Sequence, residues 1–161
     1  MLDIVNPVLA IPLDSMSEGE AIDLTKITAD RMDAVKRDKL VKFQGNVIVT
    51  QKDFTMYSNE LFVYYSGEQD IKEIIAIGNV RIIQDNRTAK SGKAVYKRTE
   101  RTLILTDNPV VKQGKDTVSG VRIIFYLDQD KSIVEGDEDQ RVNVVIYPKE
   151  GSSQEKQKER E

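Results

Sequence analysis

The chain has 161 residues and a formal net charge of −3, and it contains no His, no Cys and no Trp. These absences exclude Cys/His zinc sites, thiol nucleophiles, Ser-His-Asp triads and disulfide bonds. The slight acidic excess argues against nucleic-acid binding, and no apolar run approaches the roughly 18 residues that a membrane-spanning helix needs.

The two ends differ in composition from the middle of the chain. Residues 8–13 (VLAIPL) are apolar but short, with no basic stretch before them, so residues 1–20 form an N-terminal segment that lacks the features of a complete signal peptide. Residues 149–161 are almost wholly Glu, Gln, Lys, Arg, Gly and Ser, a composition that predicts a disordered charged tail. We therefore place a single domain at residues 21–148.

This domain is rich in β-branched residues and contains an internal repeat. In the whole chain, Val and Ile (17 and 16 residues) outnumber the 9 Leu, which favours strands. The segment at residues 45–51 (GNVIVTQ) recurs at 78–84 (GNVRIIQ) and, in a degenerate form, at 107–113 (DNPVVKQ), and residues 135–137 are a candidate fourth copy. A second element precedes each copy, at residues 29–34, 58–63, 91–96 and 120–125. About four units of some 30 residues follow, each predicted to be strands of about six residues joined by tight turns, with Gly-Asn supplying a turn or bulge.

Side-chain alternation along these strands predicts which residues face the interior. In residues 93–97 (KAVYK) the two lysines lie on the same face of the strand, so Ala94 and Tyr96 lie on the opposite, inward face. In residues 80–82 Arg81 is expected to point to water, so Val80 and Ile82 point inward. Extending this register through the repeat gives candidate lining residues, to which Met32 is added from the element at residues 29–34. They are Met32, Val47, Val49, Leu61, Val63, Val80, Ile82, Ala94, Tyr96, Leu103, Leu105, Ile123 and Phe125.

Other interpretations of particular segments remain open at this level. Residues 29–40 have a composition that also fits a helix, although their repeat partners are strand-like. Residues 128–130 (DQD) and 136–139 (GDED) resemble carboxylate pairs or a Ca²⁺ site, but turns between strands favour the same residues. Turn chemistry is the stronger interpretation, and we expect no enzyme activity, no metal and no cofactor.

Stacked strand units bury one continuous apolar seam between two facing sheets. If the sheets lie about 10 Å apart, the seam is an ordinary core, whereas sheets that splay open form a groove for acyl chains. The first and last strands of such a stack keep unpaired backbone groups, which can pair with a strand of another molecule head to tail.

Residues 43–51 (FQGNVIVTQ), with the repeat spacing from about 22 to 147, resemble the OstA-like family of lipopolysaccharide-transport proteins. The resemblance implies an all-β fold of folded-over antiparallel sheets, the β-taco or β-jellyroll. It also implies a periplasmic carrier that shields lipopolysaccharide acyl chains and, through head-to-tail oligomers, bridges an LptC-like inner-membrane component and an LptD-like outer-membrane translocon. By position, the family's lipid-contacting sites fall near Ile27, Ile82, Ile123 and Phe125.

Two further functions remain open. The chain resembles, less closely, the periplasmic domain of an LptC- or LptD-like protein, and the repeat alone also fits a structural filament that carries no lipid. Directional transport would need an energy source in a partner, because the chain has no Gly-x-x-x-x-Gly-Lys-Ser/Thr nucleotide-binding loop.

Overall fold

The computed structural model describes residues 25–67 and 70–149, and this part of the chain is built almost entirely of β-strands. Our predictions for residues 1–20 and for the charged tail beyond Lys149 concern residues outside the described part. The elements are β1 (Lys26–Thr28), β2 (Arg31–Val35), the 3-10 turn η3 (Lys36–Asp38), β3 (Leu40–Gln51), β4 (Phe54–Ser66), β5 (Asp70–Gln84), β6 (Arg87–Lys97), β7 (Thr102–Thr106), β8 (Val110–Gln113), β9 (Asp116–Ser119), β10 (Arg122–Tyr126), β11 (Lys131–Glu135) and β12 (Asn143–Val145).

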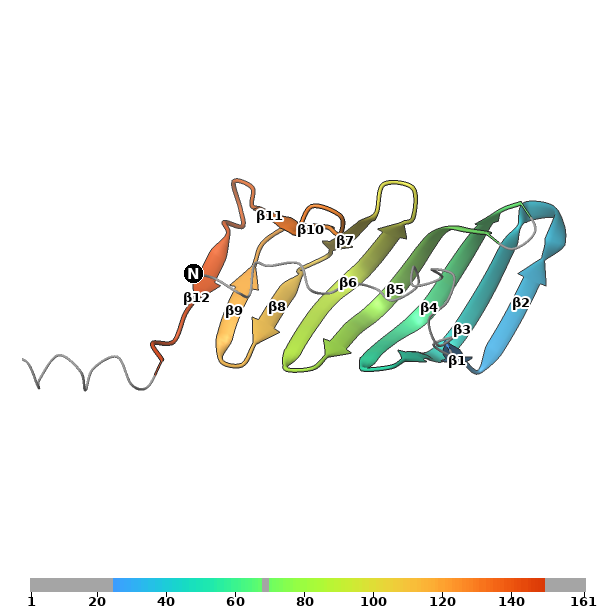
Figure 1. Cartoon of the computed structure of the whole chain (residues 1–161), viewed down its shortest axis with the longest axis horizontal. Coiled ribbons are helices and arrows are strands. Elements are labelled where there is room, and N and C mark those ends of the chain that lie inside the picture. The colour runs from blue at the N-terminus through green and yellow to red at the C-terminus, as the bar shows by residue number, and fades with distance from the viewer. Residues whose placement is uncertain (1–24, 68–69, 150–161) are drawn as a thin grey trace, which may run out of the picture.

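The strands form one antiparallel sheet of twelve strands (Figure 1). Its main path runs β1-β3-β4-β5-β6-β7-β10-β11, and β2 pairs with β3, β8 with β6 and β9, and β12 with β9. The ends of the path are not joined to each other in the described residues, so the sheet is not a closed barrel. The all-β, antiparallel fold predicted from the sequence is confirmed, and residues 29–40 form β2 and η3 rather than an α-helix.

The central strands are longer than the sequence predicted. β3, β4, β5 and β6 have 12, 13, 15 and 11 residues, about twice the expected six, because each passes through a bend instead of ending in a turn. In β3 and β5 the bend is the Gly-Asn pair of the repeat, where the pairing register shifts and all four residues have positive φ angles between 46° and 83°. The repeat therefore encodes a β-bulge in the middle of a long strand.

Aligned bends in neighbouring strands fold the sheet along a line that we call the crease. On one side of the crease lies leaf A, made of β1, β8, β9, β12 and residues 47–51, 54–57, 80–84 and 87–90 of the long strands. On the other side lies leaf B, made of β2, β7, β10, β11 and residues 40–44, 60–66, 70–77 and 93–97. The side chains of both leaves meet in one buried apolar cluster.

Short hydrogen bonds hold neighbouring strands together at the crease. The Asp30 backbone N–H donates to the Gly45 carbonyl at 2.9 Å, and the Asn46 side-chain amide donates to the Asp30 carboxylate at 2.9 Å. In the degenerate third copy, Asp107 and Asn108 also have positive φ, and the Gly92 N–H donates to the Asp107 carbonyl at 2.8 Å.

The candidate fourth copy of the repeat does not form a bend of this kind. Gly136 follows the end of β11 and opens a loop, and β12 begins at Asn143. Leaf B therefore ends at β11 and leaf A at β12, with the loop between them.

Candidate functional site

The inner face of each leaf carries an apolar row that crosses every strand. We define the inner face as the one that bears Val49, Ile82 and Leu105. In leaf A one row, read from the pairing register, is Ile27, Val49, Met56, Ile82, Ala89, Val111, Val118 and Val144. In leaf B the corresponding row is Met32, Phe43, Leu61, Ala76, Ala94, Leu105, Ile123 and Val134.

Nearly all candidate lining residues from the sequence lie in this interior. Those between Val47 and Phe125 in the chain are at most 5% exposed and belong to the apolar cluster. Ile27, on β1, is half-buried against the cluster. Met32 has the inward register but is 59% exposed, because β2 is the edge of leaf B and no strand lies beyond it in the described residues. A cluster this well buried stabilises the fold by itself, so burial alone does not identify a lipid site.

Sequence reasoning missed part of the same inner face. Phe54, Met56, Ala89, Val111 and Val118 are all at most 9% exposed and complete the leaf A rows. Val111 stands in the degenerate third copy at the position of Val49 and Ile82, so the repeat register alone could have found it. The strands that follow each hairpin turn carried no motif, which is why the remaining residues were missed.

The apolar interior is uncovered at both ends of the stack. Along the leaf B row, the exposed fraction falls from 59% at Met32 to 2% at Leu61, while at the far end Ile123 is 1% exposed and Val134 is only half-buried. In leaf A, Val118 is 3% exposed but its outer neighbour Val144 is 41% exposed. Each end therefore presents inner-face side chains that no further strand covers in the described residues.

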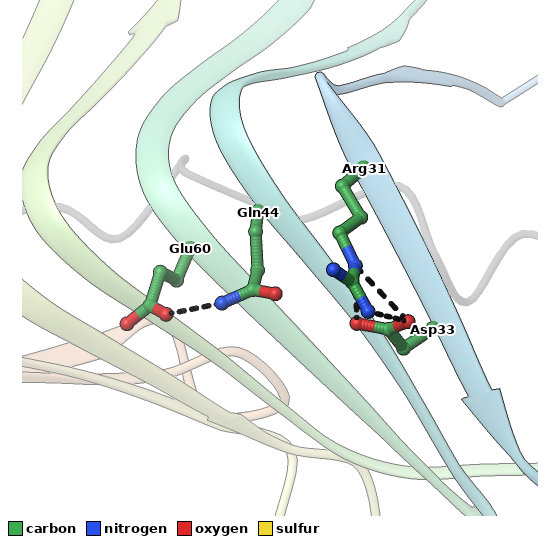
Figure 2. A network of polar contacts seen from close by, with 4 residues as sticks. All are labelled: Arg31, Asp33, Gln44 and Glu60. Carbon is green, nitrogen blue, oxygen red and sulfur yellow. Dashed lines mark hydrogen bonds and ion pairs between the residues drawn. The ribbon is translucent and has the colours of Figure 1, made fainter.

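At the β2 end, the outer face carries a network of charged and polar side chains (Figure 2). Arg31 and Asp33, both on β2, form an ion pair with a 2.8 Å contact, and the bond from Arg31 lowers the pKa of Asp33. Glu60 on β4 accepts hydrogen bonds from Lys42 and Gln44 on β3, each 3.2 Å long. These bonds, that from Lys42 first, lower the pKa of the Glu60 carboxyl.

At the other end, β12 and the residues on either side of it present apolar side chains to solvent. Val142, Val144, Val145, Ile146 and Tyr147 are between 41% and 54% exposed. The segment is attached to β9 by strand pairing and by a 2.8 Å hydrogen bond from the Tyr147 N–H to the Asp116 carboxylate. This end is therefore an ordered, apolar edge.

An open hollow of about 630 Å³ follows the crease. Its lining includes Asn46, Asn59, Asn79 and Asn108 and, from leaf A, Tyr57 and Arg81. The guanidinium carbon of Arg81 lies over the Tyr57 ring, 4.4 Å from the ring centroid. The lining also includes Val47 and Val80 of the buried apolar cluster, so the hollow lies where outer-face side chains meet the edge of the apolar interior.

The acidic clusters of the sequence lie in turns. Asp137 accepts hydrogen bonds from the backbone N–H groups of Asp139 and Gln140 at 2.9 and 2.7 Å, and Asp128 pairs with Arg101. Within residues 25–67 and 70–149, no group of three or more Asp and Glu side chains is arranged to hold a metal ion. The same residues contain no helix with both the length and the hydropathy needed to cross a bilayer.

Comparison with known proteins agrees with this geometry. Residues 26–131, about two thirds of the chain, match the family model described as LptA/(LptD N-terminal domain) LPS transport protein. The chain belongs to this family. The resemblance to OstA-like proteins found in the sequence is thus confirmed.

Individual relatives are more distant. The lipopolysaccharide export system protein LptA of Escherichia coli K12 is 27% identical over 137 residues, covering 81% of this chain and 74% of LptA, and LptA of Shigella flexneri gives the same values. Among solved structures, the fold is similar to LptH of Pseudomonas aeruginosa, described as the LptA-homologous periplasmic component of the lipopolysaccharide transport device. That match has a TM-score of 0.68 at 17% identity, and covers 78% of this chain and 96% of LptH.

Proposed function

We propose that this protein is a non-enzymatic, periplasmic carrier of lipopolysaccharide that holds acyl chains on the inner faces of leaves A and B. The observation that carries the proposal is the apolar inner face, which crosses every strand and is uncovered at both ends. Family membership and the similarity to LptA and LptH support lipopolysaccharide as the cargo. An acyl chain takes the place of contacts between the two leaves, so the leaves move apart when it binds.

The energetics make the protein a shield rather than a motor. Burying a chain of about 12 carbons is worth roughly 10 kcal/mol relative to water, at about 0.8 kcal/mol per CH₂. Transfer from a bilayer to the inner face exchanges one apolar medium for another and is close to neutral. The carrier therefore lowers the barrier to crossing water, and direction comes from its partners.

Strand directions favour end-to-end association. Each leaf contains eight strand segments side by side, each antiparallel to its neighbours. They run across the leaf from β2 to β11 in leaf B and from β1 to β12 in leaf A. Because eight is even, the first and last segments run in opposite directions. A second copy placed beyond β11 and β12 by simple translation thus meets both edges with antiparallel strands, which continues the hydrogen bonding and the apolar interior.

The same edges are the surfaces by which an LptC-like inner-membrane component and an LptD-like translocon would attach. Both would extend the sheet as another copy does. In this proposal a chain of copies forms one continuous apolar path between two membranes.

Photo-crosslinking tests the lipid site. Photoreactive residues placed at Ile82 and Phe125, which are 1% and 2% exposed, should form adducts with lipopolysaccharide, whereas one at the outward Arg81 should not. Ile82 and Arg81 are neighbours in the same strand, so Arg81 is a control for local structure. Adducts at Arg81 without adducts at Ile82 and Phe125 would show that cargo binds the outer face.

A structural filament without cargo is the second candidate, favoured by the tight burial of the cluster in this structure. It needs the same edge pairing but a permanently dry interior. Mass spectrometry of the purified protein distinguishes the two, because a filament protein carries no lipid and takes up no fluorescent fatty acid.

A further inference from the structure

Each of the three repeat copies in the sequence ends in a glutamine, namely Gln51, Gln84 and Gln113. Each is the last residue of its strand before a hairpin, and each lies two positions beyond a buried inner-face residue, so all three have the inward parity. The pairing register places them in one row along the rim of leaf A, opposite the crease. The row is Gln51, Phe54, Gln84, Arg87, Gln113 and Asp116.

Two of these glutamines have an unpaired polar atom in a buried position. The Oε1 atoms of Gln84 and Gln113 are shielded from solvent, yet neither accepts a hydrogen bond from any of the described residues. A buried acceptor without a donor is unfavourable, because the oxygen has given up its hydrogen bonds to water and gained none in return. The repeat nevertheless keeps glutamine at this position in copies that differ elsewhere.

In the strand register, Arg87 stands opposite Gln84 on one side and opposite Gln113 on the other. Its side chain is half-buried, and no hydrogen bond or ion pair joins it to another residue in the described segments. The rim of the apolar interior thus carries a cation with an unused carbonyl-type acceptor on each side. We call Gln84, Arg87 and Gln113 the polar rim.

We propose that the polar rim binds the head of the acylated guest, with the two carboxamide oxygens accepting hydrogen bonds from it and Arg87 pairing with an anionic oxygen. This inference rests on the acyl-chain binding proposed above. An extended chain that enters the interior past this row, with its polar end level with the rim, runs past Ile82 and Ala89 toward the crease.

The atoms of the rim select the chemical class of the head. An acceptor oxygen is satisfied only by an N–H or O–H donor. An amide-linked or hydroxylated acyl chain offers such a donor, whereas a simple ester linkage offers none. Arg87 adds a preference for a carboxylate or phosphate near the linkage, because a guanidinium binds such groups through charge-assisted hydrogen bonds.

A matched pair of probes tests this selection on the whole chain. N-Dodecanoylglycine and O-dodecanoylglycolate have the same chain and the same carboxylate and differ only in an amide N–H against an ester oxygen. The wild type should bind the amide about three- to tenfold more tightly, as expected for one hydrogen bond to a buried acceptor. The double variant Gln84→Met, Gln113→Met should bind both probes equally. Arg87→Met should keep the preference for the amide but bind N-dodecanoylglycine no better than its uncharged methyl ester.

Matched controls separate the rim from general effects. Gln129→Met changes an exposed turn glutamine, and Arg81→Met removes a cation from the outer face of the same leaf; both should leave all ratios unchanged. Equal binding of amide and ester by the wild type, or a preference for the ester, would overturn the inference and indicate that water occupies the rim acceptors. Failure of the wild type to bind any dodecanoyl probe would instead overturn the proposed carrier function.

Discussion

The crease depends on glycine for two physical reasons that one pair of substitutions separates. Gly78 has φ +83°, and a Cβ placed there would lie 2.5 Å from Asn59 Nδ2 and 3.0 Å from the Asn59 Cβ. Gly67 has nearly the same φ, +84°, but no described atom lies within 4 Å of the point that a Cβ would occupy there. Alanine at either site therefore meets the same backbone strain, and only Gly78 adds a steric clash.

The expected costs follow from these contacts. Gly67→Ala should lower the free energy of unfolding by about 1–2 kcal/mol, the cost of a left-handed conformation for a residue with a Cβ. Gly78→Ala should lower it by that amount plus about 1–3 kcal/mol, because Asn59 must move away and the bends of β4 and β5 lose their fit. Urea unfolding measures both.

Equal losses in the two variants would refute the argument. They would mean that Asn59, which is exposed, swings into solvent at no cost. The crease would then depend on backbone conformation alone, and the contact between neighbouring bends would contribute nothing to the fold.

Three further outcomes are expected. Leu105→Ala, at a fully buried site, should cost about 2–5 kcal/mol in urea unfolding, whereas Ile77→Ala on the outer face should cost far less; similar losses would show that the leaves are loosely packed. Because the pKa of Glu60 is lowered in the folded protein, its carboxylate stabilises the fold above pH 4.5, and this stabilisation is lost as the pH falls through the lowered pKa. Glu60→Gln should flatten the fall of unfolding free energy in this acid range, and an unchanged pH profile would contradict the role of Glu60. Met32→Asp should weaken self-association in sedimentation but leave the monomer stable, since Met32 is exposed; a large loss of monomer stability would show that the β2 edge is part of the core.

Much of this fold was determined by local sequence. Val and Ile in alternation fix strands, and the Gly-Asn pairs mark backbone positions that need positive φ, which the structure has at Gly45, Asn46, Gly78 and Asn79. The period of two then fixes which side chains face inward, so residues such as Val49, Ile82 and Leu105 were placed correctly. These are properties of a few neighbouring residues, and a sequence displays them directly.

Other features depended on how distant strands align. A Gly-Asn pair is compatible with a hairpin turn or with a bulge, and only the pairing of β3 to β6 makes it a bulge that folds the whole sheet. Met32 has the same local pattern as its buried counterparts but is exposed, because the strand that would cover it is not part of this chain's described sheet. Likewise, three glutamines separated by about 30 residues fall in a single row only when their strands lie side by side. The backbone of one strand determines to which face each side chain points, whereas the strands that pack beside it determine whether that side chain is buried and which residues it contacts.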